Sequence, residues 1–118
     1  MDMQMIYSLF RLFSGEEEAQ KYMPLLMTAV QEVKASLRQD TDEQEVRLCY
    51  LAAAVANLRY TQMFGAREKA LATYAGTVAK PSDPSQQIRF AEQLVNSYKS
   101  LCADLLKEKN FFFSGVRG

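Results

Sequence analysis

The stretch Leu48-Cys49-Tyr50-Leu51-Ala52-Ala53-Ala54-Val55-Ala56 decides the fold, because it is an uninterrupted apolar run in an otherwise mixed sequence. A helix formed by these residues has no polar face, and such a helix is surrounded by protein. At ~1.5 Å per helical residue the run is far too short to cross a bilayer. The sequence therefore predicts a buried central helix over about 43–66, with an extension to 74 left open, and no membrane association.

Three further helices are predicted around this central helix, over about 2–13, 16–39 and 84–109. In each of them apolar residues recur at spacings of three and four, which gives the helix one apolar face. The pattern fails over 75–82, where Gly76 and Pro81 favour an extended loop. The sequence thus predicts an all-α bundle of four helices, forming a single domain over 1–118 with an aromatic C-terminal tail.

The boundaries of these helices are predicted from capping patterns. Ser14 with Glu17, and Asp42 with Glu45, both match the capping box, in which two side chains satisfy the free N–H groups of a helix start. Pro24 interrupts the second helix, and a proline inside a helix removes a hydrogen bond and clashes with the preceding turn. Either the helix kinks near Lys21, or the capped segment is a short turn and the main helix begins at Pro24; we expect the kink.

The composition argues against an enzyme or a cofactor-binding protein. The chain contains no histidine, which removes the commonest general base and most zinc and iron ligand sets. Cys49 and Cys102 lie inside apolar stripes, which is typical of reduced, buried thiols in a cytoplasmic protein. The acidic residues over 40–45 lack the spacing and the turn glycine of a calcium loop, so helix capping accounts for them. We therefore predict no catalysis, no metal and no cofactor.

The charge balance argues against nucleic acid as a partner. The 14 Lys and Arg side chains are matched by 14 Asp and Glu side chains, so the formal net charge is zero. A domain that binds a phosphate backbone usually carries a clear positive excess. The expected partners are therefore other protein chains, including further copies of this one.

Two segments outside the helical pattern are candidate protein interfaces. Three consecutive aromatic residues near the C-terminus cannot all point one way in an extended chain, so at least one faces outward unless a partner covers it. This tail either folds back on its own bundle or contacts another protein, and an exposed apolar patch usually marks a protein contact. The loop over 76–82 is a second candidate arm. The interface residues predicted in these two segments are Phe111, Phe112, Phe113, Val116, Thr77 and Val78.

A further candidate lies in the central helix, where Arg47, Asn57, Arg59 and Gln62 interrupt the apolar pattern. In the simpler interpretation these residues form the narrow polar face of the helix. In the more specific interpretation, Arg59 forms an ion pair with a carboxylate across an interface. Arg59 is therefore included among the candidate interface residues. Both interpretations stay open at this point.

The order of elements resembles a known family. An alanine-rich run over 50–60 follows a short amphipathic helix, a second helix and an acidic turn. A loop with Ala75-Gly76-Thr77-Val78 then leads to the last helix, and the chain ends in Phe112-Phe113-Ser114-Gly115-Val116. This layout, over about 5–116, is similar to the small all-helical head–tail connector (head-completion) proteins of tailed bacteriophages and prophages. Pro24 departs from the long straight helix expected there.

The resemblance implies a structural role without catalytic residues. Connector proteins of this kind assemble as rings beneath the phage portal, which implies self-association, contacts with other virion proteins and a location in the virion or in the cytoplasm of a bacterial host. A ring subunit repeats one head-to-tail contact, so it needs two complementary patches. The alternative is a cytoplasmic helical adaptor or regulatory protein that works as a dimer through its third and fourth helices.

Overall fold

The computed structural model describes the backbone of residues 1–75 and 84–107 and the side chains of 1–64 and 85–107. These residues form α1 (Met3–Ser14), α2 (Met23–Ala35), α3 (Val46–Ala75) and α4 (Pro84–Leu101), with short 3-10 turns at Ala19–Tyr22 and Ala103–Leu105. In this part of the chain Leu37 and Leu106 form an isolated antiparallel bridge, and no strand is present. The predicted all-α bundle of four helices is confirmed.

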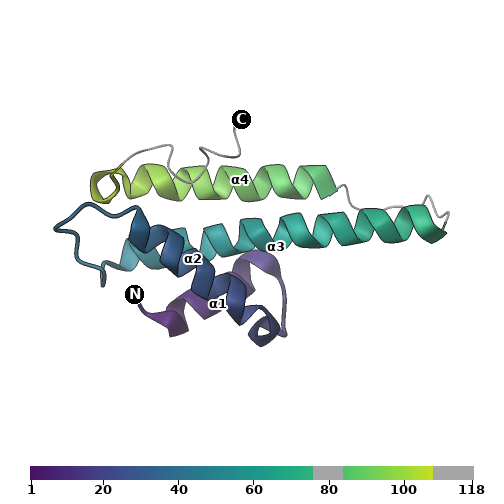
Figure 1. Cartoon of the computed structure of the whole chain (residues 1–118), viewed down its shortest axis with the longest axis horizontal. Helices are drawn as coiled ribbons and strands as arrows, with labels where there is room; N and C mark the ends of the chain where they lie inside the picture. Colours follow the sequence, from purple (N-terminus) through teal and green to yellow (C-terminus); the bar gives the residue numbers. More distant parts are fainter. Residues whose placement is uncertain (76–83, 108–118) are drawn as a thin grey trace.

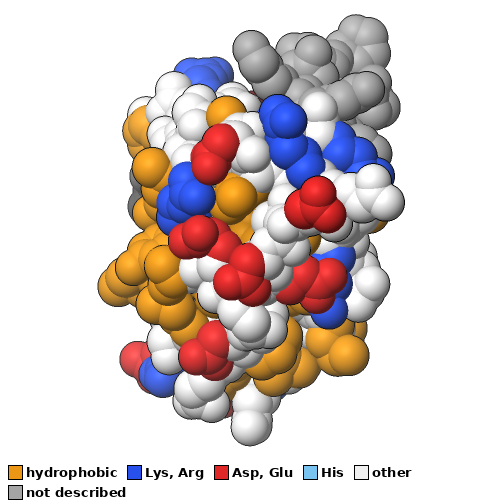
Figure 2. All heavy atoms as spheres, turned by 90° about the vertical axis from the view of Figure 1, so that its left-hand side faces the viewer, with side chains coloured by type: hydrophobic (Ala, Val, Ile, Leu, Met, Phe, Trp, Pro, Cys, Tyr) orange, Lys and Arg blue, Asp and Glu red, His pale blue; other side chains and the backbone are white. Residues whose placement is uncertain are grey.

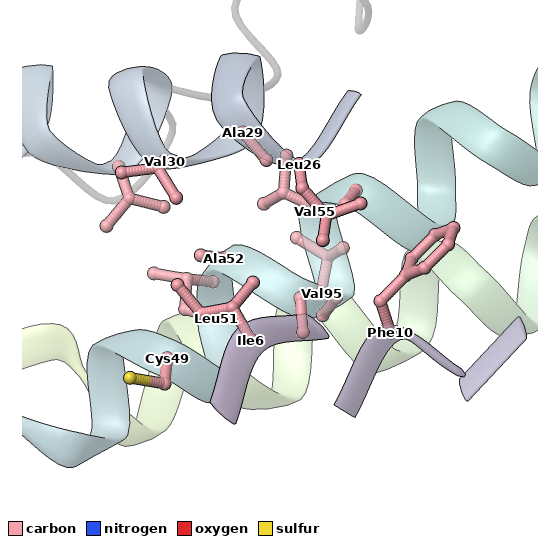
Figure 3. Close-up of a cluster of buried hydrophobic side chains, with 14 of the residues drawn as sticks. Ile6, Phe10, Leu26, Ala29, Val30, Cys49, Leu51, Ala52, Val55 and Val95 are labelled. Carbon is pink, nitrogen blue, oxygen red and sulfur yellow. The ribbon is translucent and has the colours of Figure 1, made fainter. Parts of the chain in front are cut away.

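The helix α3 is the axis of the bundle. Figure 1 shows it lying between α4 on one side and α1 and α2 on the other. All residues from 48 to 56 are buried except Tyr50, which is half-buried, so no face of this stretch is open to solvent. Figure 3 shows side chains of α1, α2 and α4, such as Ile6, Leu26 and Val95, converging on this part of α3. The predicted central helix is confirmed, and its extension is real because α3 continues to Ala75.

The first helix lies where the sequence predicts it, and its two ends have clear causes. The carboxylate of Asp2 accepts hydrogen bonds from the backbone N–H groups of Gln4 and Met5, at 3.0 and 3.4 Å, and so caps α1. Gly15 ends the helix with φ of 75°, a left-handed conformation that favours glycine. Its N–H donates to the Arg11 carbonyl at 2.8 Å.

The predicted kink near Lys21 is wrong, and the second helix is shorter than the predicted 16–39. The main helix α2 starts at Met23, which places Pro24 in its first turn, where a missing N–H costs nothing. The expected Ser14 cap is also wrong, because Ser14 is the last residue of α1 and its hydroxyl donates to the Phe10 carbonyl at 2.7 Å. At the other end α2 stops at Ala35, because the chain then turns to form its bridge at Leu37.

The central helix begins three residues later than predicted, at Val46 instead of 43. The Asp42 carboxylate accepts from the backbone N–H of Gln44 at 2.9 Å, and the N–H of Glu45 donates to the Asp42 carbonyl at 3.1 Å. Asp42 therefore stabilises a turn that leads into the helix, a local structure that aspartate favours as strongly as a helix cap. The predicted capping box at Asp42 and Glu45 is wrong.

The last helix ends at Leu101, not at 109, because the chain turns back to meet α2. After the 3-10 turn, the N–H of Arg38 donates to the Leu105 carbonyl at 2.9 Å, and the N–H of Lys107 donates to the Ser36 carbonyl at 2.8 Å. These bonds join segments that lie far apart in sequence. No local pattern signals such an ending.

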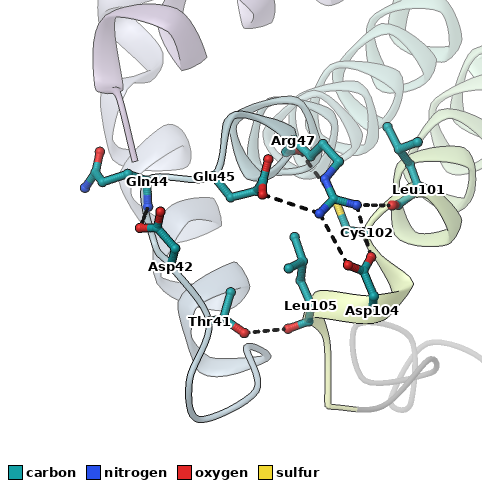
Figure 4. Close-up of polar contacts among 9 residues, drawn as sticks. All are labelled: Thr41, Asp42, Gln44, Glu45, Arg47, Leu101, Cys102, Asp104 and Leu105. Atoms are coloured by element: carbon teal, nitrogen blue, oxygen red, sulfur yellow. Dashed lines mark hydrogen bonds and ion pairs between the residues drawn. The ribbon is translucent and has the colours of Figure 1, made fainter.

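An arginine ties the start of α3 to the end of α4 (Figure 4). The Arg47 guanidinium donates to the Leu101 carbonyl and to Asp104 Oδ1, both at 3.0 Å, and lies 3.4 Å from Glu45 Oε1. These hydrogen bonds hold the pKa of the Asp104 carboxyl below its usual value. The Thr41 hydroxyl donates to the Leu105 carbonyl in the same junction, at 3.2 Å.

Acidic side chains gather on the end of the molecule formed by this junction, as Figure 2 shows. Among the residues that the structure describes, no three His, Cys, Asp or Glu side chains are arranged to hold a metal ion. Over the same residues, no helix is long and apolar enough to cross a membrane.

Candidate protein-interaction site

A groove of about 490 Å³ opens between α3, α4 and the C-terminal end of α1. One wall comes from α3, where spacings of three and four residues place four side chains on one face of the helix. These are Asn57, Tyr60, Thr61 and Phe64. We call this feature the Asn57 groove. Its volume lies within the range of sites that hold a compact ligand or a short peptide segment.

The opposite wall comes from α4, with Gln87, Phe90, Ala91 and Leu94, and Phe13 at the end of α1 completes the lining. Phe90 lies outside the buried stripe of α4 and keeps 59% of its surface exposed. A large aromatic side chain left this exposed beside a groove is an apolar contact surface without a cover among the described residues. Such surfaces are typical of protein interfaces.

The α3 wall is held by aromatic packing. The Tyr60 ring meets Phe64 at 4.8 Å and Phe10 at 5.5 Å between ring centroids, in edge-to-face arrangements that aromatic pairs prefer. The Tyr60 hydroxyl donates to Glu16 Oε1 at 2.8 Å, which fixes the ring from its far end. This wall is therefore a preformed surface, and preformed surfaces lower the entropic cost of binding.

Asn57 is the buried polar residue of the groove, which Ser14, Thr61 and Gln87 also line. Its side chain is 6% exposed, and its Oδ1 has no hydrogen-bond partner in the described part of the protein. A buried carbonyl oxygen without a donor costs about 1–3 kcal/mol, so it needs an explanation. The backbone carbonyl of Asn57, by contrast, accepts from the Thr61 hydroxyl at 2.6 Å. The side-chain oxygen is therefore buried inside the bundle without a donor among the described residues.

A second groove, of about 480 Å³, runs along the other flank of α4. It is lined by basic side chains, Arg38, Lys99 and Lys107, together with Asn96 and Ser100. The Nε–H of Arg38 donates to the Leu106 carbonyl at 2.9 Å, so this arginine holds the chain in place. We call this feature the basic groove, and the described chain ends in it at Lys107.

Arg59, predicted as an interface residue, has a partner within its own chain. Its guanidinium donates to both carboxylate oxygens of Glu32, at 3.2 and 3.0 Å, and so joins α3 to α2. Both side chains are about one-third exposed, with 28% and 30% of their surfaces accessible. The structure therefore gives Arg59 a role inside the bundle, and its role in an interface stays a prediction.

The other predicted interface residues lie outside the described part of the chain. These are Phe111, Phe112, Phe113, Val116, Thr77 and Val78. Arg59, the predicted interface residue that the structure does describe, is not among the residues that line the Asn57 groove. The role of the other residues in a protein contact stays a prediction.

Both cysteines are buried and free, as predicted. Burial raises the pKa of the Cys102 thiol to about 11, so this thiol stays protonated and unreactive at neutral pH. Its Sγ lies 3.5 Å from the Arg47 carbonyl, inside the junction at the ends of α3 and α4. The thiol contributes to packing in that junction.

Sequence reasoning missed two residues of the groove. Asn57 was read as part of a narrow polar face, although it follows directly on the apolar run and shares a helix face with Tyr60 and Phe64. Phe90 was passed over, although it is an aromatic residue that falls off the apolar stripe of its helix. An exposed aromatic and a buried amide are the signals that could have indicated the groove.

No family model, no curated protein and no solved structure matches this chain.

Proposed function

We propose that this protein is a non-catalytic structural subunit that works by binding other protein chains, as a head–tail connector subunit of a tailed phage or prophage does. Its partners are further copies of itself and other virion proteins, and it acts in the virion or in the cytoplasm of a bacterial host. The small all-α bundle agrees with the resemblance in layout. The absence of histidine from the sequence supports a role without acid–base catalysis.

The Asn57 groove is the observation that carries this proposal. It combines an exposed aromatic side chain, Phe90, with a buried side-chain oxygen that has no partner among the described residues. A groove that carries both aromatic and polar side chains fits a protein segment, because such a segment offers both apolar side chains and backbone N–H groups. A ring subunit needs an acceptor of this kind for its neighbour.

The native mass of the full chain in solution tests the proposal directly. Light scattering coupled to size exclusion is expected to give a closed assembly of several 13.4 kDa subunits, with a mass that does not change over a tenfold dilution. Electron microscopy of the same sample should show rings. A mass of two subunits would favour the dimeric adaptor instead, and a monomer at high concentration would overturn the assembly function.

A further inference from the structure

The first helix carries more apolar surface than the core covers. Ile6 and Phe10 are fully buried and mark the side of α1 that faces the core. At about 3.6 residues per turn, Leu9 and Leu12 lie about 60° and 120° around the helix from Ile6, on the side away from Phe10. Leu9 is half-buried, and Leu12 keeps 74% of its surface exposed. The apolar side of α1 therefore continues beyond the edge of the core.

The last helix extends its apolar side in the same way, on one flank. Val95 and Cys102 are fully buried and mark the core side of α4. Tyr98 and Leu101 lie about 60° and 120° around the helix from Val95, in the same direction. Tyr98 is half-buried, and Leu101 is 51% exposed. The opposite flank of α4 carries polar side chains of the basic groove, so the apolar extension is confined to one side.

The two apolar flanks meet over the start of α3. The Tyr98 ring stacks on Phe13 of α1, with 6.1 Å between ring centroids, and its centroid lies 5.5 Å from that of Tyr50. Tyr50 belongs to α3, and Val46, one turn before it, is 48% exposed. We call this surface the apolar face. It consists of Leu9, Leu12, Val46, Tyr50, Tyr98 and Leu101.

The apolar face contains no charged side chain. Farther around the two helices, the next residues are Ser8 beyond Leu12 and Ser97 beyond Leu101, and both are uncharged. Helices that lie on a membrane surface carry several Lys or Arg side chains, whereas Arg11 is the single charged residue of α1. A strongly acidic or basic partner would find no opposite charge on this face. The face therefore fits an uncharged apolar surface.

We infer that the apolar face packs against the same face of a second copy of this chain, related by a twofold axis. In such an isologous contact each side chain meets members of its own face, so charges of one sign would repel each other across the axis. An uncharged face avoids this cost. Tyr50 and Tyr98 supply aromatic rings, which are enriched at protein interfaces. The inference goes beyond the proposed function, because it concerns a surface other than the Asn57 groove.

The size of this side of the molecule is close to what a stable dimer needs. A standard interface takes roughly 20–30 residues from each partner. About half of the residues of a surface helix lie on one side, so the 12 residues of α1 and the 18 residues of α4 offer roughly 15. The start of α3 adds Val46 and Tyr50 between the two helices. The described helices therefore supply most of such an interface by themselves.

A double charge variant of the full chain tests the contact. Leu12→Glu with Leu101→Glu changes two exposed side chains, so circular dichroism should show an unchanged helical fold. Because an isologous contact joins copies in pairs, its loss is expected to halve the native mass measured by light scattering. Met27→Glu with Gln31→Glu, at exposed positions of α2, is the matched control and should keep the wild-type mass. A Leu12, Leu101 variant with the wild-type mass would overturn the inference.

Mixing charge variants tests whether the partner is a second copy. Leu12→Lys with Leu101→Lys should also halve the mass, because like charges again meet across the axis. An equimolar mixture of the Glu and Lys variants should restore the wild-type mass, because every mixed pair brings opposite charges together. A mass that stays halved in the mixture would overturn the contact between copies.

The wild-type mass separates this inference from the proposed function. If the wild-type chain forms a closed assembly of several subunits and the Glu variant keeps its mass, the assembly function stands and the inference fails. If the wild-type chain is a dimer that the Glu variant converts to monomers, the inference stands and the closed assembly fails. A wild-type chain that stays monomeric at high concentration would overturn both, and the apolar face would then serve a different protein.

Discussion

Residues 48–56 and residues 57–64 belong to the same helix, α3, and face the same neighbouring helices with different side chains. In the first stretch, small side chains such as Ala52 and Ala53 are fully buried, and the neighbouring helices close over them. In the second stretch, Tyr60 and Phe64 pack edge to face, and a groove of about 490 Å³ remains beside them. We call residues 48–56 the sealed half of this pair and residues 57–64 the open half, because the groove lies beside the second.

The difference shows how side-chain size varies along one helix, with small side chains in the buried core and aromatic rings beside the groove. Alanine lets helix backbones approach closely, so little space is left for a partner. The larger rings of Tyr60 and Phe64 lie beside the groove. The buried amide of Asn57 stands at the border between the two parts. The predictions below test each part in turn.

The largest expected effect comes from opening the sealed half. Leu51 is fully buried in α3, so Leu51→Ala should lower the free energy of unfolding by about 2–5 kcal/mol, the range for buried leucines. Urea denaturation followed by circular dichroism measures the change. The matched control is Met27→Ala, because Met27 is 58% exposed, and its effect should stay within about 0.5 kcal/mol. Equal effects of the two variants would contradict the sealed core.

The next effect comes from overfilling the same half. Ala52 is fully buried, and Ala52→Leu should destabilise the fold by about 1–3 kcal/mol because the added carbons force neighbouring helices apart. The same measurement applies, with Ala35→Leu on the exposed surface of α2 as the control. A stabilised Ala52→Leu protein would mean that this half also contains unfilled space.

A smaller change in the free energy of unfolding, in the stabilising direction, is expected at Asn57, between the two halves. Asn57→Leu should raise the free energy of unfolding by about 1–2 kcal/mol, because it removes a buried oxygen without a partner among the described residues. Asn96→Leu, at an exposed asparagine of α4, is the control and should change stability by less than about 0.5 kcal/mol. A destabilised Asn57→Leu protein would show that the amide serves the fold instead of a partner.

The smallest expected effect on stability comes from the junction between Arg47 and Asp104, which ties the end of α4 to the start of α3. Hydrogen bonds from Arg47 keep the pKa of Asp104 below its ordinary value of 3.8, so the folded state binds the proton less readily than the unfolded state. This contribution to stability is present above pH 3.8 and is lost as the pH falls through the lower, folded-state pKa. Asp104→Asn should therefore lower the Tm slightly at pH 7, and the difference from wild type should vanish at strongly acidic pH. Glu17→Gln, at an exposed glutamate, should show no such convergence.

Much of the fold could be predicted because its signals are local. The apolar run over 48–56 indicated the buried axis, and spacings of three and four gave the other helices. The first helix was predicted to within one residue from its apolar spacing, and its Asp2 cap and Gly15 terminator are also local signals. The kink predicted from Pro24 is wrong. A proline can either kink a helix or occupy its first turn, and which of the two occurs depends on where the preceding helix ends.

The amino-acid sequence by itself determined that this protein is a four-helix bundle around an apolar axis, and that it has no histidine chemistry. Periodicity and composition suffice for both, since they depend on each residue and its near neighbours. Tertiary structure alone decided where α2 and α4 end, because the bridge between Leu37 and Leu106 joins distant segments. It also decided that Asn57 is buried without a partner among the described residues, because burial depends on helices that meet only after folding. The Asn57 groove exists only because α1, α3 and α4 pack together in the folded protein.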